Sequence, residues 1–247
     1  MRILCFANFD YLRVAENWIA QIENIGLAHR ITMVALDLAT ANALSGKDVS
    51  VLYRPAPGSE RRRLWLHRTE VIFEFLKTGV PVIHSDADAI WLTDPCADLL
   101  RPDADMVFSQ GTSWPGESHA KRGFVACCGL FALRPSLELF NFTDALLVRL
   151  AEVADDQLAF NQLIDERFTD WVIIDPYRLA FHGTSFTCSP EPMRSTNETL
   201  SVAILPHHLY PRVVSTLKDV RVAHPPSGRS GSETEAALRK HGLWRLD

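Results

Sequence analysis

The sequence has little of what marks several common classes of protein. It has no basic excess, since 25 lysines and arginines stand against 30 acidic residues and the net charge is −5. Proteins that bind nucleic acid usually present a basic surface, so we expect no nucleic-acid partner and only a local site for any phosphate group. No apolar run approaches the roughly 20 residues of a membrane-spanning helix. The apolar stretch at residues 3–7 is too short for a secretory leader.

Cysteine is also scarce. The five cysteines are odd in number, never occur in C-x-x-C spacing, and mostly stand among apolar residues. Neither a disulfide framework nor a zinc knuckle is therefore predicted. We expect reduced, buried thiols in a cytoplasmic protein. The residues concerned are Cys5, Cys96, Cys127, Cys128 and Cys188.

Strand-like and helix-like segments alternate through the first half of the chain. A hydrophobic content of 47% is enough for a substantial core, and alternation of this kind predicts right-handed crossovers and a mostly parallel sheet flanked by helices. We find no internal repeat and no linker, so we expect a single α/β domain over residues 1–247, with a loop-rich region at 181–231. Strands are predicted at 2–8, 31–36, 49–53, 80–83, 106–109, 124–133 and 171–174, and helices at 14–25, 64–76, 137–153 and 157–167.

The predicted strand at 80–83 is followed by Asp86 and Asp88 in the run His84-Ser85-Asp86-Ala87-Asp88. In extended backbone, residues i and i+2 point to one side, so the two carboxylates lie together. Two hard oxygen ligands suit a divalent cation that also holds a diphosphate. The alternative is a pair of solvated loop aspartates. The apolar strand before the motif and the apolar segment 90–92 after it favour a functional site.

The run from His84 to Pro95 resembles the central motif of the nucleotide-diphospho-sugar transferase family, which includes plant xylosyl- and arabinosyltransferases of the GT-A fold. The similarity continues in order through residues 129–135, 156–161 and 223–225. It implies a GT-A-type, Rossmann-like sheet with a nucleotide-binding half at 1–110. Residues 111–247 would form the sugar and acceptor half, ending in a metal- and phosphate-binding loop.

The resemblance also implies an activity and a set of site residues. The activity is metal-dependent transfer of a sugar, with retention, from a nucleoside-diphosphate sugar, UDP-sugar favoured, to a hydroxyl of a glycan, lipid-linked or protein acceptor. The metal is Mn²⁺ or Mg²⁺. Asp86, Asp88 and His224 would ligate it, and Asp156 and Gln157 would face the transferred sugar as catalytic residues. The nucleotide-sugar-binding residues would be Ala7, Asn8, Arg68, Asp86, Ala87, Ser227, Gly228 and Arg229.

Several of these residues have a plainer structural interpretation. Asn8 is a typical turn former, Arg68 could be a solvated arginine on a helix face, and an aspartate at 155 or 156 could cap a helix. The Gly/Ser segment 227–231 could be a mobile loop, or a lid that orders on nucleotide binding. Both interpretations stay open for each.

Two further patterns imitate metal sites. Asp103 and Asp105 repeat the Asp-x-Asp spacing but precede a predicted strand, so we expect turn chemistry there. His207 and His208 are adjacent, and neighbours in an extended segment face opposite sides and do not chelate one ion easily. At most one of them is a candidate for the acceptor cleft.

Two alternative functions fit part of the pattern. A haloacid-dehalogenase-like phosphatase would use Asp86 as nucleophile and Asp88 as acid/base, but its motif would lie on the first strand. A nucleotide-sugar-binding protein without turnover would keep the same residues. Basic runs at 61–63 and 239–241 could also make weak peripheral contact with an anionic membrane, although such runs are common at a helix start and a last turn.

Overall fold

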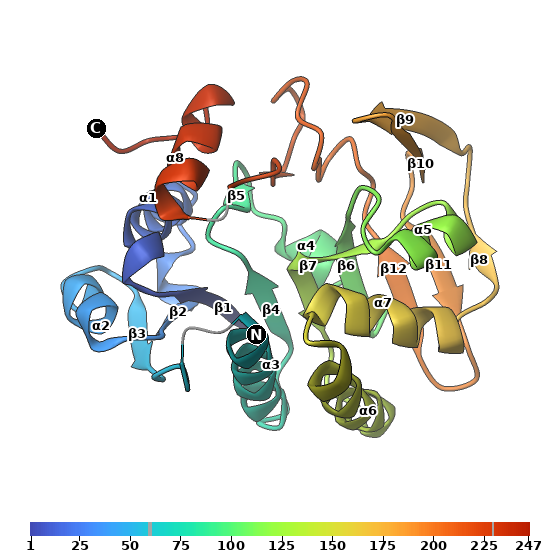
Figure 1. Cartoon of the computed structure of the whole chain (residues 1–247), viewed down its shortest axis with the longest axis horizontal. Helices are drawn as coiled ribbons and strands as arrows, with labels where there is room; N and C mark the ends of the chain where they lie inside the picture. The colour runs from blue at the N-terminus through green and yellow to red at the C-terminus, as the bar shows by residue number, and fades with distance from the viewer. Residues whose placement is uncertain (59–60, 229) are drawn as a thin grey trace.

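A nine-stranded mixed sheet forms the centre of the protein (Figure 1). The computed structural model describes residues 1–58, 61–228 and 230–247, without the side chains of residues 61 and 62. Within these residues only β7 and β11 run against the other strands, which confirms a mixed, mostly parallel sheet. The spatial order is β3 (Ser50–Tyr53), β2 (Ile31–Ala35), β1 (Arg2–Ala7), β4 (Val82–Ser85), β7 (Ala126–Leu133), β6 (Met106–Gln110), β12 (Ser201–Ile204), β11 (Met193–Thr196) and β8 (Trp171–Val172).

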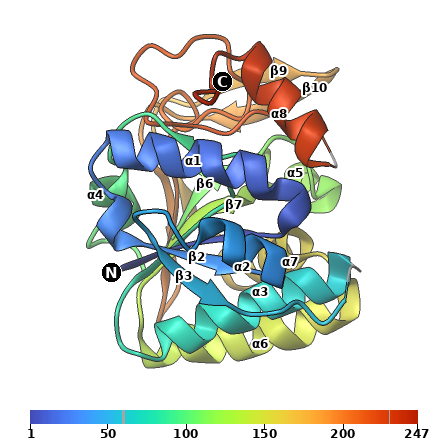
Figure 2. The same ribbon diagram turned by 90° about the vertical axis from the view of Figure 1, so that its left-hand side faces the viewer.

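Helices cover both faces of this sheet. Figure 2 shows α1 on one side of the strands and α3 and α6 on the other. No helix of the described residues is both long and apolar enough to cross a membrane. One face carries α1 (Leu12–Asn24), α4 (Cys96–Leu99) and α8 (Gly231–Lys240), and the other carries α3 (Arg61–Leu76), α6 (Leu137–Val153) and α7 (Asp156–Arg167).

The alternation of side chains along β1 divides the core in two. Ile3 and Cys5 pack on the side of α1, with Trp18, whereas Leu4 packs on the side of α3, with Phe73. A strand buried on both faces needs apolar residues at every position, and this is why the run at residues 3–7 shows no alternation of polarity. All five cysteines are free and buried, as the sequence predicts.

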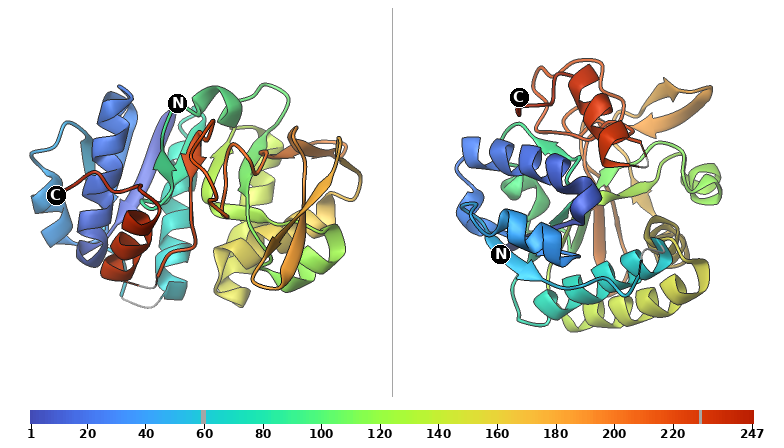
Figure 3. Two further views of the ribbon diagram at one scale, coloured as in Figure 1. Left: turned by 90° about the horizontal axis from the view of Figure 1, so that it is seen from above. Right: turned by 60° about the vertical axis from the view of Figure 1, so that its left-hand side comes forward.

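Smaller elements complete the chain beyond the central sheet. Seen from above in Figure 3, the C-terminal helix α8, in red, lies next to the blue helix α1. The chain before α8 pairs with the segment that follows the Asp-x-Asp turn: β13 lies antiparallel to β5, with Trp91 opposite Val222 and Ile90 opposite Ala223. These elements are α2 (Leu38–Leu44), β5 (Ile90–Trp91), α5 (Gly116–Arg122), β9 (Tyr177–Phe181), β10 (Thr184–Cys188), β13 (Val222–Ala223) and 3-10 turns at Phe9–Tyr11 and Ala28–Arg30.

The prediction of a loop-rich region at 181–231 is wrong in part. This stretch contains β10, β11, β12 and β13. β10 and β11 are rich in serine and threonine, and β11 alternates buried and accessible residues, whereas β12 and β13 are apolar but only four and two residues long, so none of the four gives a strong strand signal. Pairing with distant strands stabilises them, as when β12 lies parallel to β6.

Candidate functional site

The Asp-x-Asp motif lies in a tight turn directly after β4, between the carboxyl ends of β1 and β4 and the amino end of β7. The backbone N–H of Asp86 donates to the carbonyl of Gly129 at 2.7 Å, and the N–H of Ala89 donates to the carbonyl of Asp86 at 3.1 Å. Below the turn, the indole N–H of Trp91 donates to Oγ of Ser85 at 3.1 Å. The turn that carries both aspartates is thus fixed by hydrogen bonds on either side.

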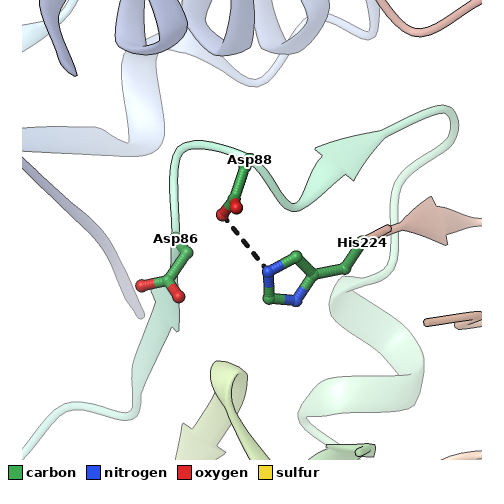
Figure 4. A group of neighbouring side chains, drawn as sticks. All are labelled: Asp86, Asp88 and His224. Carbon is green, nitrogen blue, oxygen red and sulfur yellow. Dashed lines mark ion pairs between the residues drawn. The ribbon is translucent and has the colours of Figure 1, made fainter. Parts of the chain in front are cut away.

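Asp86, Asp88 and His224 converge at this edge, as Figure 4 shows. One ligand atom from each lies within 4.8 Å of the others, and Oδ1 of Asp88 is 3.2 Å from Nε2 of His224. The histidine follows β13 directly, and its backbone N–H donates to the carbonyl of Pro211 at 3.0 Å. The structure therefore brings together the three residues predicted as metal ligands.

Asp88 and His224 shift each other's pKa. Burial and the charge of Arg212 lower the pKa of His224, but Asp88 and a contact with Cys127 outweigh them and raise it to about 9. Burial raises the pKa of Asp88, and the imidazolium outweighs this, so the pKa of Asp88 lies below its usual value. A proton on His224 supplies positive charge beside Asp88, as a bound cation would also do.

Arg68 on α3 links two carboxylates that lie far apart in the sequence. Its Nη1 donates to Oδ1 of Asp86 at 2.9 Å, and its Nη2 donates to Oδ2 of Asp156. Burial raises the pKa of Asp86, but Arg68 outweighs this and holds it well below the usual value. Arg68 is only 14% exposed, so the interpretation as a solvated arginine is wrong.

His84 supports Asp86 from beneath, a role that the sequence analysis missed. Its Nε2 lies 3.1 Å from Oδ1 of Asp86. Burial, with the charge of Arg68, lowers the pKa of this imidazole, so the neutral ring donates its N–H to the carboxylate. The available signal was the spacing of two residues, which places both side chains on one side of the strand end.

The capping residue of α7 and the first two residues of the helix have separate roles. Asp155 caps the helix, since its Oδ1 accepts from the N–H of Leu158 at 2.8 Å. Asp156 is free of that task and pairs with Arg68. Gln157 accepts from the N–H of Cys128 at 3.2 Å and donates to the carbonyl of Trp114 at 2.7 Å. Its amide is therefore held between β7 and the loop before α5.

A cavity of about 470 Å³ opens beside the aspartates. Asn8 both caps the following 3-10 turn, accepting from Tyr11 N at 3.2 Å, and faces the cavity. Ser227 donates to Oδ2 of Asp88. Arg229 lies outside the described residues. The other residues predicted to bind the nucleotide sugar all line the cavity: Ala7, Asn8, Arg68, Asp86, Ala87, Ser227 and Gly228; Phe6, Asp10, Tyr11, Leu36, Leu64, Trp65 and Asp88 line it too.

Gly129 leaves room for the metal-ligating group, and the sequence analysis gave it no role. A Cβ at this position would lie 2.7 Å from Oδ2 of Asp86 and 2.9 Å from Nδ1 of His224, and closer still to Cε1 of that ring. Any side chain would clash with both Asp86 and His224. The signal was a glycine within an otherwise apolar strand, which often marks a close approach.

Asp103, Asp105 and His207 make contacts elsewhere in the fold and not with the three predicted metal ligands. Asp103 pairs with Arg194 at 2.9 Å, and Asp105 accepts from the N–H and hydroxyl of Ser201 at 2.8 and 2.7 Å. His207 is buried and accepts backbone N–H groups at Nε2. None of these residues belongs to the group around Asp86 and Asp88.

Comparison with known proteins agrees with the family resemblance seen in the sequence. The profile of the nucleotide-diphospho-sugar transferase family matches residues 26–224. Arabinosyltransferase RRA2 of Arabidopsis thaliana is 27% identical over 189 residues, which cover 65% of this chain and 43% of the relative. UDP-D-xylose:L-fucose α-1,3-D-xylosyltransferase MGP4 of the same plant is 25% identical over 191 residues, 66% of this chain and 53% of the relative. The chain spans about half the length of the curated relatives it matches.

A solved structure shares the whole fold. The galactosyltransferase LgtC, solved with donor and acceptor sugar analogues, superposes with a TM-score of 0.54 at 13% identity and covers 100% of this chain and 97% of its own. At that identity the likeness concerns the fold alone. Together with the family match, it shows that this chain has the GT-A fold and belongs to the nucleotide-diphospho-sugar transferase family.

Proposed function

We propose that this chain transfers a sugar from a UDP-sugar to a hydroxyl group of a glycan, lipid-linked or protein acceptor, with a bound divalent cation. The observation that carries the proposal is the convergence of His224 with Asp86 and Asp88, two aspartates that line the 470 Å³ cavity. Membership of the nucleotide-diphospho-sugar transferase family argues against the phosphatase alternative. The printed name of the relative MGP4 includes UDP-D-xylose, which supports a uridine nucleotide.

The three side chains fit a cation such as Mn²⁺ or Mg²⁺. Mg²⁺ binds oxygen ligands at about 2.1 Å in octahedral geometry, so neighbouring ligand atoms lie about 3 Å apart. Oδ1 of Asp88 and Nε2 of His224 are 3.2 Å apart. Two carboxylates with one imidazole suit Mn²⁺ as well. The raised pKa of His224 marks the same position as one that attracts positive charge.

When bound, the cation would act as a Lewis acid for the departing diphosphate. The residues of the chain would position the donor around it. Arg68 holds Asp86 and Asp156 in place and neutralises part of their charge. Gln157, fixed by Cys128 and Trp114, would contact the transferred sugar.

The pairing of the carboxylates supports retention of anomeric configuration. An inverting enzyme needs a free general base close to the acceptor. Asp86 and Asp156 are paired with Arg68, and Asp88 with His224. None of these three carboxylates is free to take a proton from an acceptor hydroxyl.

The setting in which the chain works stays a proposal. Five free, buried thiols support a reducing compartment, and we propose the cytoplasm. Weak contact of the basic runs 61–63 and 239–241 with an anionic membrane is likewise a prediction, which vesicle co-sedimentation tests.

Turnover separates an enzyme from a binding protein that has lost activity. The test incubates the chain with a panel of UDP-sugars and Mn²⁺, with and without excess chelator, and measures release of UDP. We expect release with one or a few donors and its loss on chelation. Tight binding of a UDP-sugar without hydrolysis or transfer to any acceptor would favour the binding protein. Release that survives complete chelation would contradict the role of the metal.

A further inference from the structure

The segment that carries His224 has only a short strand of its own. This strand, β13, consists of Val222 and Ala223 and pairs with β5 through two residue pairs. So short a pairing is marginally stable by itself, whereas metal sites tolerate deviations of only about 0.2 Å. The position of His224 therefore depends on contacts outside β13.

The turn at residues 206–211 supplies the first of these contacts. The carbonyl of Pro211 accepts from the N–H of His224 at 3.0 Å. Two residues earlier, the carbonyl of Leu209 accepts from the N–H of Arg221 at 2.8 Å. The turn thus lies along the chain that leads to the histidine, and any movement of the turn moves the backbone of His224 with it.

Asp98 on α4 contacts both the turn and the chain before β13. Its Oδ2 accepts from the hydroxyl of Tyr210 and from Nη1 of Arg221, the latter at 2.5 Å. Tyr210 directly precedes Pro211 and is only 1% exposed. Burial, with the hydrogen bond to Asp98, raises the pKa of Tyr210, so its hydroxyl stays protonated and donates. One carboxylate therefore links the two segments that meet at His224.

The helix that carries Asp98 belongs to the same stretch of chain as the two metal-ligating aspartates. It follows β5, and the N–H groups of Leu92 and Thr93, between β5 and α4, donate to the carbonyl of Arg221 at 2.8 and 3.2 Å. The side chain of Asp98 and the backbone of Arg221 thus hold the chain after the Asp-x-Asp turn against the chain that leads to His224.

We propose that Asp98 is a positioning residue for the metal centre, which keeps His224 in place opposite the two aspartates. It acts through Tyr210 and Arg221. The inference rests on the proposed function, because it concerns the cation of that site. Hydrogen bonds to a carboxylate are stronger than neutral ones, and loss of Asp98 would leave the buried hydroxyl of Tyr210 without its acceptor. The turn and β13 would then be free to shift away from the aspartates.

The test is titration of Mn²⁺ into the full chain with saturating UDP, with free Mn²⁺ measured by electron paramagnetic resonance. Asp98→Ala removes the carboxylate. Asp105→Ala is the matched control, because Asp105 also joins two distant segments and accepts from the N–H and hydroxyl of Ser201 at 2.8 and 2.7 Å. We expect Asp98→Ala to weaken Mn²⁺ binding at least about five-fold. The control should stay within about two-fold of the wild type.

A double-mutant cycle shows whether Asp98 acts through His224. In a His224→Ala background, Asp98→Ala should weaken Mn²⁺ binding less than about two-fold, because the ligand that Asp98 positions is gone. A general disturbance of the structure would lower the affinity equally in both backgrounds. Unchanged Mn²⁺ affinity in Asp98→Ala, or an equal loss in both backgrounds, overturns the proposal.

Thermal melting shows whether Asp98→Ala folds. If it does not, Tyr210→Phe replaces it in the cycle, since this change removes a single hydroxyl from the network. It should weaken Mn²⁺ binding at least about three-fold, and unchanged affinity overturns the proposal. A wild type that binds no Mn²⁺ in the presence of UDP would contradict the proposed function and this inference with it.

Discussion

Replacement of Gly129 by alanine should damage the metal site with little effect on the rest of the fold. The new Cβ would lie 2.7 Å from Oδ2 of Asp86, and nonbonded heavy atoms prefer about 3.5 Å. Asp86 must therefore move by about 0.8 Å and the His224 ring by more, whereas metal sites tolerate deviations of about 0.2 Å. We expect Gly129→Ala to lower Mn²⁺ affinity by roughly 10- to 100-fold, the usual cost of disturbing the support of a ligand.

Isothermal calorimetry with Mn²⁺ measures this change, and thermal melting measures the cost to stability, which overpacking places at about 1–3 kcal/mol. Gly116→Ala is the matched control, because a Cβ there meets nothing within 4 Å. The control should bind Mn²⁺ as the wild type does. If Gly129→Ala binds Mn²⁺ with unchanged affinity, the close approach of Asp86 and His224 over Gly129 is not what shapes the site.

Three further predictions concern the residues around the metal-ligating group. Arg68→Met removes the guanidinium partner of the buried carboxylate of Asp156 and of the half-buried carboxylate of Asp86. It should reduce the free energy of unfolding by about 3 kcal/mol, measured by urea denaturation; a loss under 1 kcal/mol would contradict the bridge. Because the folded pKa of His224 is raised to about 9, the proton competes with the metal up to that pH, and Mn²⁺ affinity should rise by up to 10-fold per pH unit from pH 7 to 9 and then level off. The metal-free ion pair with Asp88 has the opposite dependence: its stabilisation is complete below pH 6.5 and is lost as the pH rises through 9. Gln157→Ala should lower kcat and spare Mn²⁺ affinity, as steady-state kinetics and calorimetry show together; an equal loss of metal binding would argue against a role at the sugar.

Segments with strong local signals were predictable from the sequence. The helix predicted at 137–153 matches α6, because Ser136 caps it and its apolar residues repeat at helical spacing. The turn with Asp86 and Asp88 follows from the apolar strand before it. His224 could be predicted only through the family resemblance, since the pairing of β13 with β5 has no signature in either two-residue strand.

Contacts between distant segments explain most of what the sequence did not reveal. Arg68 and Asp156 are 88 positions apart, and no local pattern indicates that α3 and α7 point these side chains at each other. The close approach of Gly129 to His224, and the hydrogen bond that the N–H of Arg212 donates to His207, likewise have no local signal in the sequence. Such roles depend on which side chains the packing of helices and strands brings together.

The central claim is that Asp86, Asp88 and His224 hold one cation that is needed for donor binding. Its most direct test is titration of UDP into the wild type, His224→Ala and Asp105→Ala. Each protein is titrated once with saturating Mn²⁺ and once with excess chelator in place of the metal. Asp105 has the same local spacing but contacts Ser201 instead. We predict that chelation and His224→Ala each weaken UDP binding at least 10-fold, while Asp105→Ala binds as the wild type does. UDP affinity that is indifferent to chelation and to His224→Ala would contradict the account.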